Sequence, residues 1–230
     1  MDQSMQSYSY NTGAVAAEQR NRVLRNTYWL LALSMVPTVL GAWVGMSIGI
    51  NRILTPGIGL IVFLAGAFGF MFAIEKFKNS AAGVPLLLGF TFFMGVMLSR
   101  LLAVVLGMGN GASLVMMAFA GTGAIFLGMA TLSSVVKRDL SNMAKFMFIG
   151  VILLLVAGIA NFFIQSSALM ITLAVAAIGI FSFFILYDLK RVQDGEETNY
   201  ITATLGVYLS IYNVFQSLLA LFGIAGGSND

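Results

Sequence analysis

Two charged side chains, Arg100 and Asp188, lie within or beside long apolar stretches, where an ionisable group is a functional candidate by default. Asp188 precedes Lys190 and Arg191, so it is either an ordinary loop carboxylate paired with one of these cations or a group that functions at membrane depth. Arg100 has no acid predicted at its end of the molecule except Asp230. It either extends to the lipid headgroups or lines a polar cavity.

The last apolar segment of the chain is unusually polar for a helix that faces lipid. Polar groups on several sides of a helix are better satisfied inside a bundle, where neighbouring helices supply partners. We therefore expect this last helix at the centre of the bundle and treat Ser210, Tyr212 and Asn213 as candidate polar-core residues. The polar residues are Tyr200, Tyr208, Ser210, Tyr212, Asn213, Gln216 and Ser217.

The loop before that segment is acidic and contains residues that favour helix N-termini. Glu197 follows other acids in this loop, and Thr198 or Asn199 is expected to cap the helix that begins near Tyr200. Carboxylates are stabilised near the positive N-terminal end of a helix. Capping explains much of the loop without any ligand, although these residues remain candidates for a functional loop.

The absence of cysteine and histidine narrows the chemistry. It excludes disulfides, thiolate metal sites, haem ligation by His, and Ser-His or Cys-His nucleophile pairs. The last segment has no lysine for a retinal Schiff base. We therefore expect no enzyme activity, no catalytic residues, no metal site and no cofactor.

The elements that position these residues follow from the distribution of charge. Hydrophobic residues make up 59% of the chain and charged residues 9%, against roughly 25% charged in soluble domains. Ten of the 12 Lys and Arg residues form clusters, and each stretch between clusters is long enough for two spans of about 20 residues. Short basic loops stay in the cytoplasm beside anionic lipid, and we expect no nucleic-acid binding. The clusters are Arg20, Arg22 and Arg25; Lys76 and Lys78; Lys137, Arg138 and Lys145; Lys190 and Arg191.

This pattern predicts an all-α membrane protein with seven transmembrane helices, its N-terminus cytoplasmic and its C-terminus outside. Residues 1–27 are expected to form a flexible cytoplasmic tail, 28–223 the transmembrane domain, and 224–230 a short external tail. The spans are predicted at Tyr28–Ile50, Ile53–Ile74, two within Asn79–Val136 with a break at Gly107–Gly111, two within Phe146–Tyr187 with a break at Gln165–Ser167, and Tyr200–Phe222.

The first span carries Gly41, Gly45 and Gly49, which are two consecutive GxxxG steps on one helix face. Small residues let membrane helices approach closely. The glycine face either packs within the chain or forms a homodimer seam, and the sequence leaves the oligomeric state open.

Several segments resemble the Bax inhibitor family. Glu197-Thr198-Asn199-Tyr200-Ile201 and Tyr208-Leu209-Ser210-Ile211-Tyr212-Asn213-Val214-Phe215 resemble its C-terminal signature, and Tyr187-Asp188 stands where its sixth-helix aspartate occurs. Val23-Leu24-Arg25-Asn26-Thr27-Tyr28 resembles the start of the first span in the bacterial branch that modulates the FtsH protease. The resemblance implies a seven-helix bundle in the bacterial inner membrane whose last helix is surrounded by the other six.

The resemblance implies two functions. One is an integral membrane regulator that binds a membrane-anchored AAA protease of the FtsH type. The alternative is a pH-sensitive calcium leak, with Asp188 as its gate. In the family a second aspartate pairs with the first, and two carboxylates sharing a proton can act as a pH latch. Ser210 occupies the place of that second aspartate here, and Ser99 and Arg100 stand where many members have Gly-Pro.

The predicted topology is testable with reporters fused after Asp230. An odd number of crossings from a cytoplasmic N-terminus places the C-terminus outside, so alkaline phosphatase fused there is expected to be active and green fluorescent protein dark. The opposite pair of signals would contradict the topology.

Overall fold

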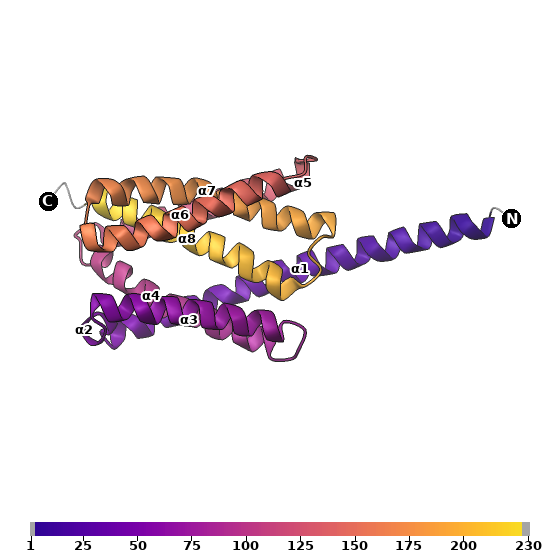
Figure 1. The fold of residues 1–230 in the computed structure, drawn as a ribbon. Helices are drawn as coiled ribbons and strands as arrows, with labels where there is room; N and C mark the ends of the chain where they lie inside the picture. The colour runs from indigo at the N-terminus through magenta and orange to yellow at the C-terminus, as the bar shows by residue number, and fades with distance from the viewer. Residues whose placement is uncertain (1–2, 227–230) are drawn as a thin grey trace.

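The computed structural model describes residues 3–226, with the backbone alone for residues 3–16, 51 and 52, and the described chain consists of helices joined by short connections. Long helices run back and forth along a common direction, and α2 is a short turn between α1 and α3 (Figure 1). The helices are α1 (Gln3–Ser47), α2 (Ile50–Ile53), α3 (Pro56–Phe77), α4 (Gly83–Leu106), α5 (Gly111–Val135), α6 (Ser141–Ile164), α7 (Ser167–Asp194) and α8 (Tyr200–Gly226).

Seven of these helices are long and apolar enough to cross a membrane, which confirms the predicted number of spans. The shortest, α3, has 22 residues, which corresponds to about 33 Å of helix against a hydrocarbon core of about 30 Å. The predicted breaks are also confirmed. The chain leaves α4 at Gly107 and starts α5 at Gly111, and Gln165 adopts a left-handed conformation between α6 and α7.

Helices α1 and α7 extend furthest beyond their predicted ends. Helix α1 starts at Gln3 rather than at Tyr28, and its last turns before Tyr28 pack on the bundle, where Val23 is buried against Val192 and Ala203. The cytoplasmic location and mobility of residues 1–27 stay predictions. Of the expected external tail, 224–226 belong to α8 and 227–230 lie outside the described residues.

Helix α7 continues to Asp194, so Asp188 lies inside the helix and not at its end. Lys190 pairs with Asp194 one turn further on at 2.7 Å, and Gly195 ends the helix in the left-handed conformation (φ 83°). The ion pair and the glycine therefore move the helix end beyond the point where the apolar run stops.

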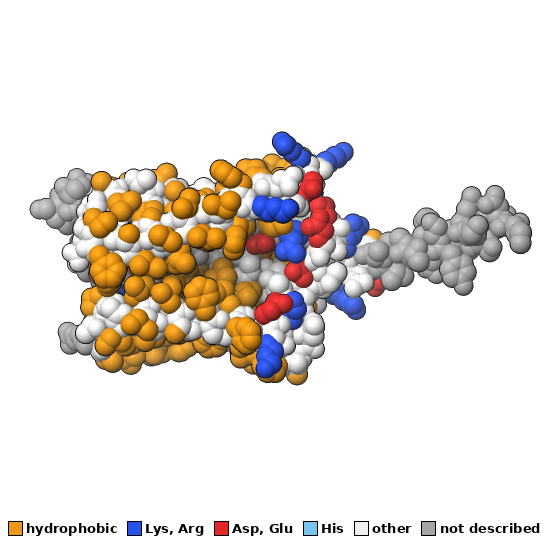
Figure 2. Space-filling view, viewed as in Figure 1, with side chains coloured by type: hydrophobic (Ala, Val, Ile, Leu, Met, Phe, Trp, Pro, Cys, Tyr) orange, Lys and Arg blue, Asp and Glu red, His pale blue; other side chains and the backbone are white. Residues whose placement is uncertain are grey.

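Charged side chains gather at one end of the bundle (Figure 2). The projecting start of α1 and the α3–α4 and α7–α8 connections lie at this same end, and the end of α8 lies at the opposite one (Figure 1). We call it the charged end; it holds the basic clusters at the start of α1, the ends of α3 and α7, and the α5–α6 connection. The clusters therefore share one side of the bundle, as their spacing predicted.

The flanks of the bundle are apolar and exposed. Trp29, Phe72, Phe119 and Phe163 are each more than 70% exposed, and the most apolar stretch of α6 has no buried residue. Apolar surface on this scale is far larger than soluble monomers tolerate. Lipid is therefore the solvent of these faces.

Helices α1 and α4 form the most extensive helix pair, and glycines make their approach possible. A Cβ added at Gly41 would overlap the Phe92 carbonyl, and one added at Gly95 would overlap the Thr38 carbonyl. At Gly45 it would lie against the Ser99 hydroxyl. The glycine face of α1 thus packs on α4 of the same chain.

Helix α8 packs against α1, α4, α5 and α7, whereas the main neighbour of α6 is α7. Helix α8 is buried on more than one side, through residues such as Val207, Tyr208 and Leu219. Helix α6 contributes a single residue, Ala144, to the buried set. The two helices therefore differ sharply in how much of their surface is covered by protein.

The glycine seam can be tested by adding a single methyl group. Gly41→Ala is expected to destabilise the folded state by about 1–3 kcal/mol, because the new Cβ overlaps backbone that cannot move aside cheaply. The matched control is Gly69→Ala on α3, where no atom lies within 4 Å of the added Cβ. That control is expected to be neutral or stabilising by up to about 1 kcal/mol. Reversible unfolding in mixed micelles measures the change in unfolding free energy for both variants. Equal changes would contradict close packing of α1 on α4 at Gly41.

Candidate functional site

Asp188 lies where α7 meets α8, near the charged end. Its carboxylate packs against Gly206, where an added Cβ would come within 2.7 Å of Oδ2. Between residues 17 and 226 no hydrogen bond or ion pair involves this carboxylate, and the following basic residues bind elsewhere: Lys190 to Asp194, and Arg191 to Glu196 and Glu197, at 3.8 Å each. Of the two alternatives that the sequence left open for Asp188, the structure thus shows no ion pair with Lys190 or Arg191.

The residues of α8 near Asp188 are small or hydroxylic. Thr202, Gly206 and Ser210 follow at four-residue intervals and so share one helix face. Ser210 is buried (3% exposed), and it makes no hydrogen bond to Asp188 within the described structure. The Thr202 hydroxyl is buried without a hydrogen-bond partner among the described residues. The carboxylate therefore packs against Gly206 and is not hydrogen-bonded to Ser210.

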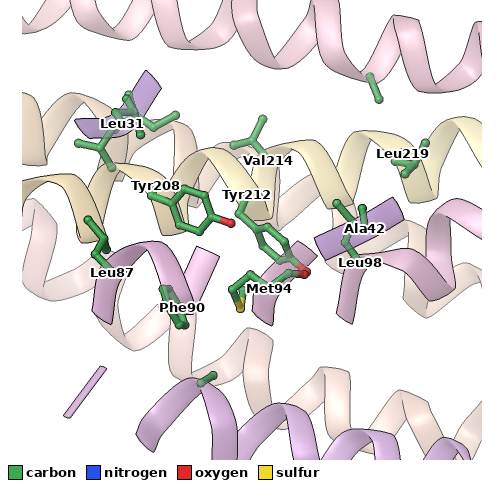
Figure 3. Packing of buried hydrophobic residues seen from close by; sticks show 14 of the residues in the cluster. Leu31, Ala42, Leu87, Phe90, Met94, Leu98, Tyr208, Tyr212, Val214 and Leu219 are labelled. Carbon is green, nitrogen blue, oxygen red and sulfur yellow. The ribbon is translucent and has the colours of Figure 1, made fainter. Parts of the chain in front are cut away.

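Tyr208 and Tyr212 form a polar strip through the middle of the bundle, where both side chains point from α8 toward α4 (Figure 3). The Tyr208 hydroxyl lies 2.9 Å from Thr38 Oγ1 of α1 and donates to the Thr91 carbonyl of α4 at 3.4 Å. The Tyr212 hydroxyl donates to the Met94 carbonyl at 3.2 Å. These bonds tie α8 to α1 and α4 in a region without water.

Asn213 and Arg100 lie apart from this strip. The Asn213 amide donates to the Leu209 carbonyl of its own helix at 2.8 Å. Arg100 is half-buried near the end of α4 and places its guanidinium against Gly59 in the first turn of α3. No described carboxylate pairs with it, and it lies at the opposite end of the bundle from Asp188. The structure therefore does not join the two charged residues into one site.

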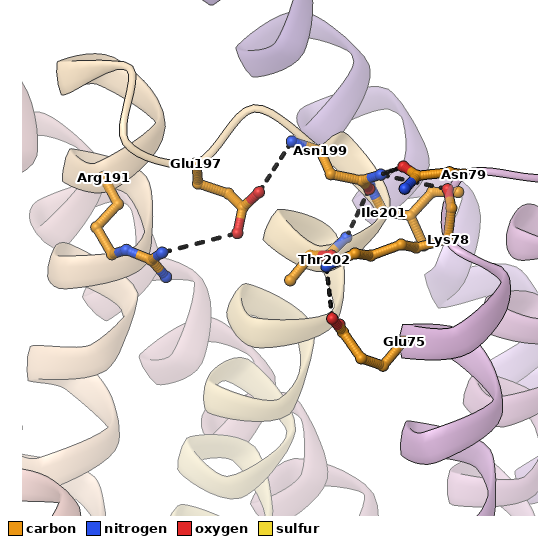
Figure 4. Close-up of polar contacts among 8 residues, drawn as sticks. All are labelled: Glu75, Lys78, Asn79, Arg191, Glu197, Asn199, Ile201 and Thr202. Atoms are coloured by element: carbon orange, nitrogen blue, oxygen red, sulfur yellow. Dashed lines mark hydrogen bonds and ion pairs between the residues drawn. The ribbon is translucent and has the colours of Figure 1, made fainter.

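The α7–α8 loop forms a polar network with the α3–α4 connection (Figure 4). Asn199 caps α8, because its Oδ1 accepts from the Ile201 and Thr202 backbone N–H groups at 2.9 and 3.2 Å. Its Nδ2 donates to Asn79 Oδ1 at 2.8 Å and to the Lys78 carbonyl at 3.3 Å. Of the two predicted caps, Asn199 is confirmed.

Glu197 holds this loop from the other side. Its Oε1 accepts from the Asn199 backbone N–H at 2.9 Å, while Oε2 faces Arg191 of α7. Thr198 is exposed and makes no hydrogen bond among the described residues, and Tyr200 packs against Val23 and Val192 where α8 begins. The predicted loop residues thus serve mainly to fix the start of α8.

The α5–α6 connection carries a perturbed carboxylate outside the spans. Asp139 Oδ1 accepts from the Ser141 backbone N–H at 2.8 Å at the start of α6. This hydrogen bond, assisted by Lys145 and Lys190, holds the pKa of Asp139 below its usual value. The carboxylate therefore stays ionised where it binds the first backbone N–H group of α6.

Some structural roles escaped the sequence reasoning. The sequence alone does not reveal the roles of Gly206 and Asn79, because these roles depend on residues of other segments that lie beside them.

The first span contains a motif with the G-x-S-x-G spacing of a serine nucleophile, Gly45-Met46-Ser47-Ile48-Gly49. Here the Ser47 hydroxyl donates to the Trp43 carbonyl within α1 at 2.8 Å, and the chain has no His to activate it.

Apolar helices that cross a membrane seven times, with basic connections at one end, define a polytopic membrane protein. A family model described as "Inhibitor of apoptosis-promoting Bax1" matches residues 20–227. The chain therefore belongs to the Bax inhibitor family, as its motifs suggested.

Bacterial relatives cover nearly all of the chain. An uncharacterized membrane protein of Vibrio cholerae is 36% identical over 211 residues, which is 92% of this chain and 93% of the relative. The modulator of FtsH protease YccA of Escherichia coli K12 is 34% identical over 205 residues, covering 89% and 91%. The same match in Escherichia coli O6:H1 is named inner membrane protein YccA. The chain is thus a multi-pass protein of the bacterial inner membrane.

The α8 cap provides a test of the loop network. Asn199→Ala is expected to lower the free energy of unfolding by about 1 kcal/mol, since two backbone N–H groups lose their acceptor, and to lower Tm by about 2–4 °C. Thr198→Ala is the neighbouring control and should stay within about 0.5 kcal/mol of the parent protein. Equal losses in the two variants would show that Asn199 does not cap the helix.

Proposed function

We propose that this protein is a non-enzymatic regulator that binds a membrane-anchored AAA protease of the FtsH type and slows its action on other membrane substrates. The observation that carries the proposal is the alignment of 89% of the chain with a relative named modulator of FtsH protease, which is itself covered over 91% of its length. A likeness over nearly the whole length of both chains favours a shared regulatory role over the sharing of a single segment.

In this proposal the charged end faces the cytoplasm and the end of α8 lies outside. The gathering of the basic clusters at one end supports this orientation through the positive-inside rule. Helix α8 acts as the core of the bundle, a role supported by its packing against α1, α4, α5 and α7. An ATP-driven protease has its motor in the cytoplasm, where ATP is available, so the projecting start of α1 lies on the same side as the motor.

The start of α1 divides into a projecting part and an attached part. From Arg20 onward the helix contacts the bundle, through the Arg20 bond to the Gln193 carbonyl (3.3 Å) and the burial of Val23. Residues 2–16 precede these contacts. In the proposal they are the handle that the protease engages.

Replacing residues 2–16 with a polar linker of equal length is expected to abolish co-purification with the protease in native membranes. It should also restore rapid turnover of a membrane substrate that the intact protein protects. Pulse-chase half-lives of the substrate and quantitative mass spectrometry of the purified complex measure the two effects.

Arg138→Gln, in the α5–α6 connection, is the control and should retain protease binding. It removes a cation from the charged end without touching the start of α1. Unchanged substrate half-lives both in a strain lacking the whole protein and in the linker variant would contradict the proposed function.

A second candidate function is a pH-sensitive calcium leak, favoured by the Asp188 carboxylate, which has no hydrogen bond or ion pair within the described structure. It ranks lower because Ser210 replaces the second aspartate and no group of three or more described carboxylates is arranged to hold a metal ion. Calcium flux into proteoliposomes, compared with Asp188→Asn, separates the two functions. A leak that is equal in both proteins, or absent at every pH, would reject the channel.

A further inference from the structure

Helix α1 carries a shallow groove of about 370 Å³ where it enters the bundle. Its lining residues recur at three- or four-residue intervals and so form one face of the helix. They are Asn21, Leu24, Arg25, Tyr28 and Trp29. None of them belongs to the Asp188 region or to the α7–α8 loop.

The groove lies at the boundary between the charged end and the apolar flank. From Tyr28 to Ser47, α1 spans about 30 Å, which matches the hydrocarbon core. Leu30 and Leu31 just beyond the groove are buried in the core. The Tyr28 ring packs edge-on against Phe126 of α5 with centroids 6.3 Å apart. Trp29 therefore lies at the depth where lipid headgroups meet acyl chains.

The polar groups of the groove are free to bind a ligand. Arg25 and Asn21 are exposed, and within residues 17–226 no hydrogen bond or ion pair involves either side chain or the Tyr28 hydroxyl. Trp29 is 73% exposed. Tyr and Trp prefer this interfacial depth, and the guanidinium of Arg matches the geometry of a phosphate.

Charge and lining both favour a lipid with a negative headgroup. Arg22 lies within one turn of Arg25, whereas the nearest acid along the helix, Glu18, lies about two turns before Arg25 and one turn before Asn21. The lining is otherwise largely apolar, which suits glycerol and acyl groups better than a soluble anion. Basic pockets beside membrane helices are known to bind the headgroups of anionic lipids.

We propose that this groove binds one anionic phospholipid, with the phosphate at Arg25 and Asn21 and the upper acyl chain against Leu24, Tyr28 and Trp29. The site is independent of the protease and calcium proposals. It also holds whichever compartment the charged end faces, because it depends only on the depth of the groove.

The two tryptophans of the chain, Trp29 and Trp43, allow a direct test. Trp43→Phe leaves Trp29 in the groove as the only tryptophan, whose emission can be excited selectively. Trp29→Phe leaves Trp43, which is 62% exposed near the other end of the span, as a reporter of bulk lipid. Each protein is reconstituted with phosphatidylglycerol or phosphatidylcholine brominated near the carboxyl end of the acyl chain, and quenching gives the relative affinity of the two lipids.

At Trp29 we expect phosphatidylglycerol to be preferred about five-fold, as one arginine near the surface would give, and at Trp43 no preference. In the Trp43→Phe background, Arg25→Gln should abolish the preference. Arg22→Gln, which removes an equal charge outside the groove lining, should keep most of it. Inorganic phosphate at millimolar concentration should not compete, because the acyl contacts are part of the site.

Four results would overturn the proposal. The first is equal quenching of Trp29 by the two lipids, and the second is an equal loss of preference in Arg25→Gln and Arg22→Gln. The third is protection of Trp29 from both brominated lipids, which would mean that a protein helix covers the groove. The fourth is competition by free phosphate, which would mean that the groove binds a soluble anion and not a lipid.

Discussion

An isolated cation at the centre of a bilayer costs about 2.5–3.5 kcal/mol even on the mildest scales. Ten Lys and Arg residues in this chain avoid that cost by lying outside the apolar spans, at one end of the bundle. Because the clusters recur after every second helix, this restriction fixes the direction of each helix. It also concentrates the polar contacts of the connecting loops, including those of Asn199 and Glu197, at the same end.

Within the bundle, association has little help from hydrophobicity, because lipid is as apolar as the helix surfaces. The structure instead relies on close backbone approach at Gly41 and Gly95 and on hydroxyl groups that bind carbonyls across helices. Tyr208 and Tyr212 each reach a carbonyl of α4. Each such bond contributes only about 1 kcal/mol, but a hydroxyl left unpaired in lipid would cost more. The polar character of α8 is thus a packing device that selects one arrangement of neighbours.

The span count and the breaks at Gly107–Gly111 and Gln165–Ser167 were predictable because they depend on local sequence. Long apolar stretches indicate spans, and residues that disfavour helix indicate the breaks between them. The start of α1 was not predictable, since its polar N-terminal part carries no apolar run that would mark a helix. The neighbour of Asp188 was also missed. The sequence directed attention to Ser210, because its hydroxyl could bind a carboxylate. In the structure the Asp188 carboxylate packs against Gly206, one turn earlier on α8. The role of a glycine depends on what lies beside it, and the register between two helices cannot be seen in either one alone.

The continuity of α1 has a mechanical consequence. The helix runs from Gln3 to Ser47, with Pro37 as a single point where a backbone hydrogen bond is missing. An axial pull on its beginning is therefore carried along the helix to the seam with α4 instead of being absorbed by slack chain. That seam is loaded in shear along its whole length, so its contacts resist together and not one after another. A motor that grips this helix would meet its greatest resistance at the outset of extraction, and would stall there more readily than on a protein whose first span is weakly held.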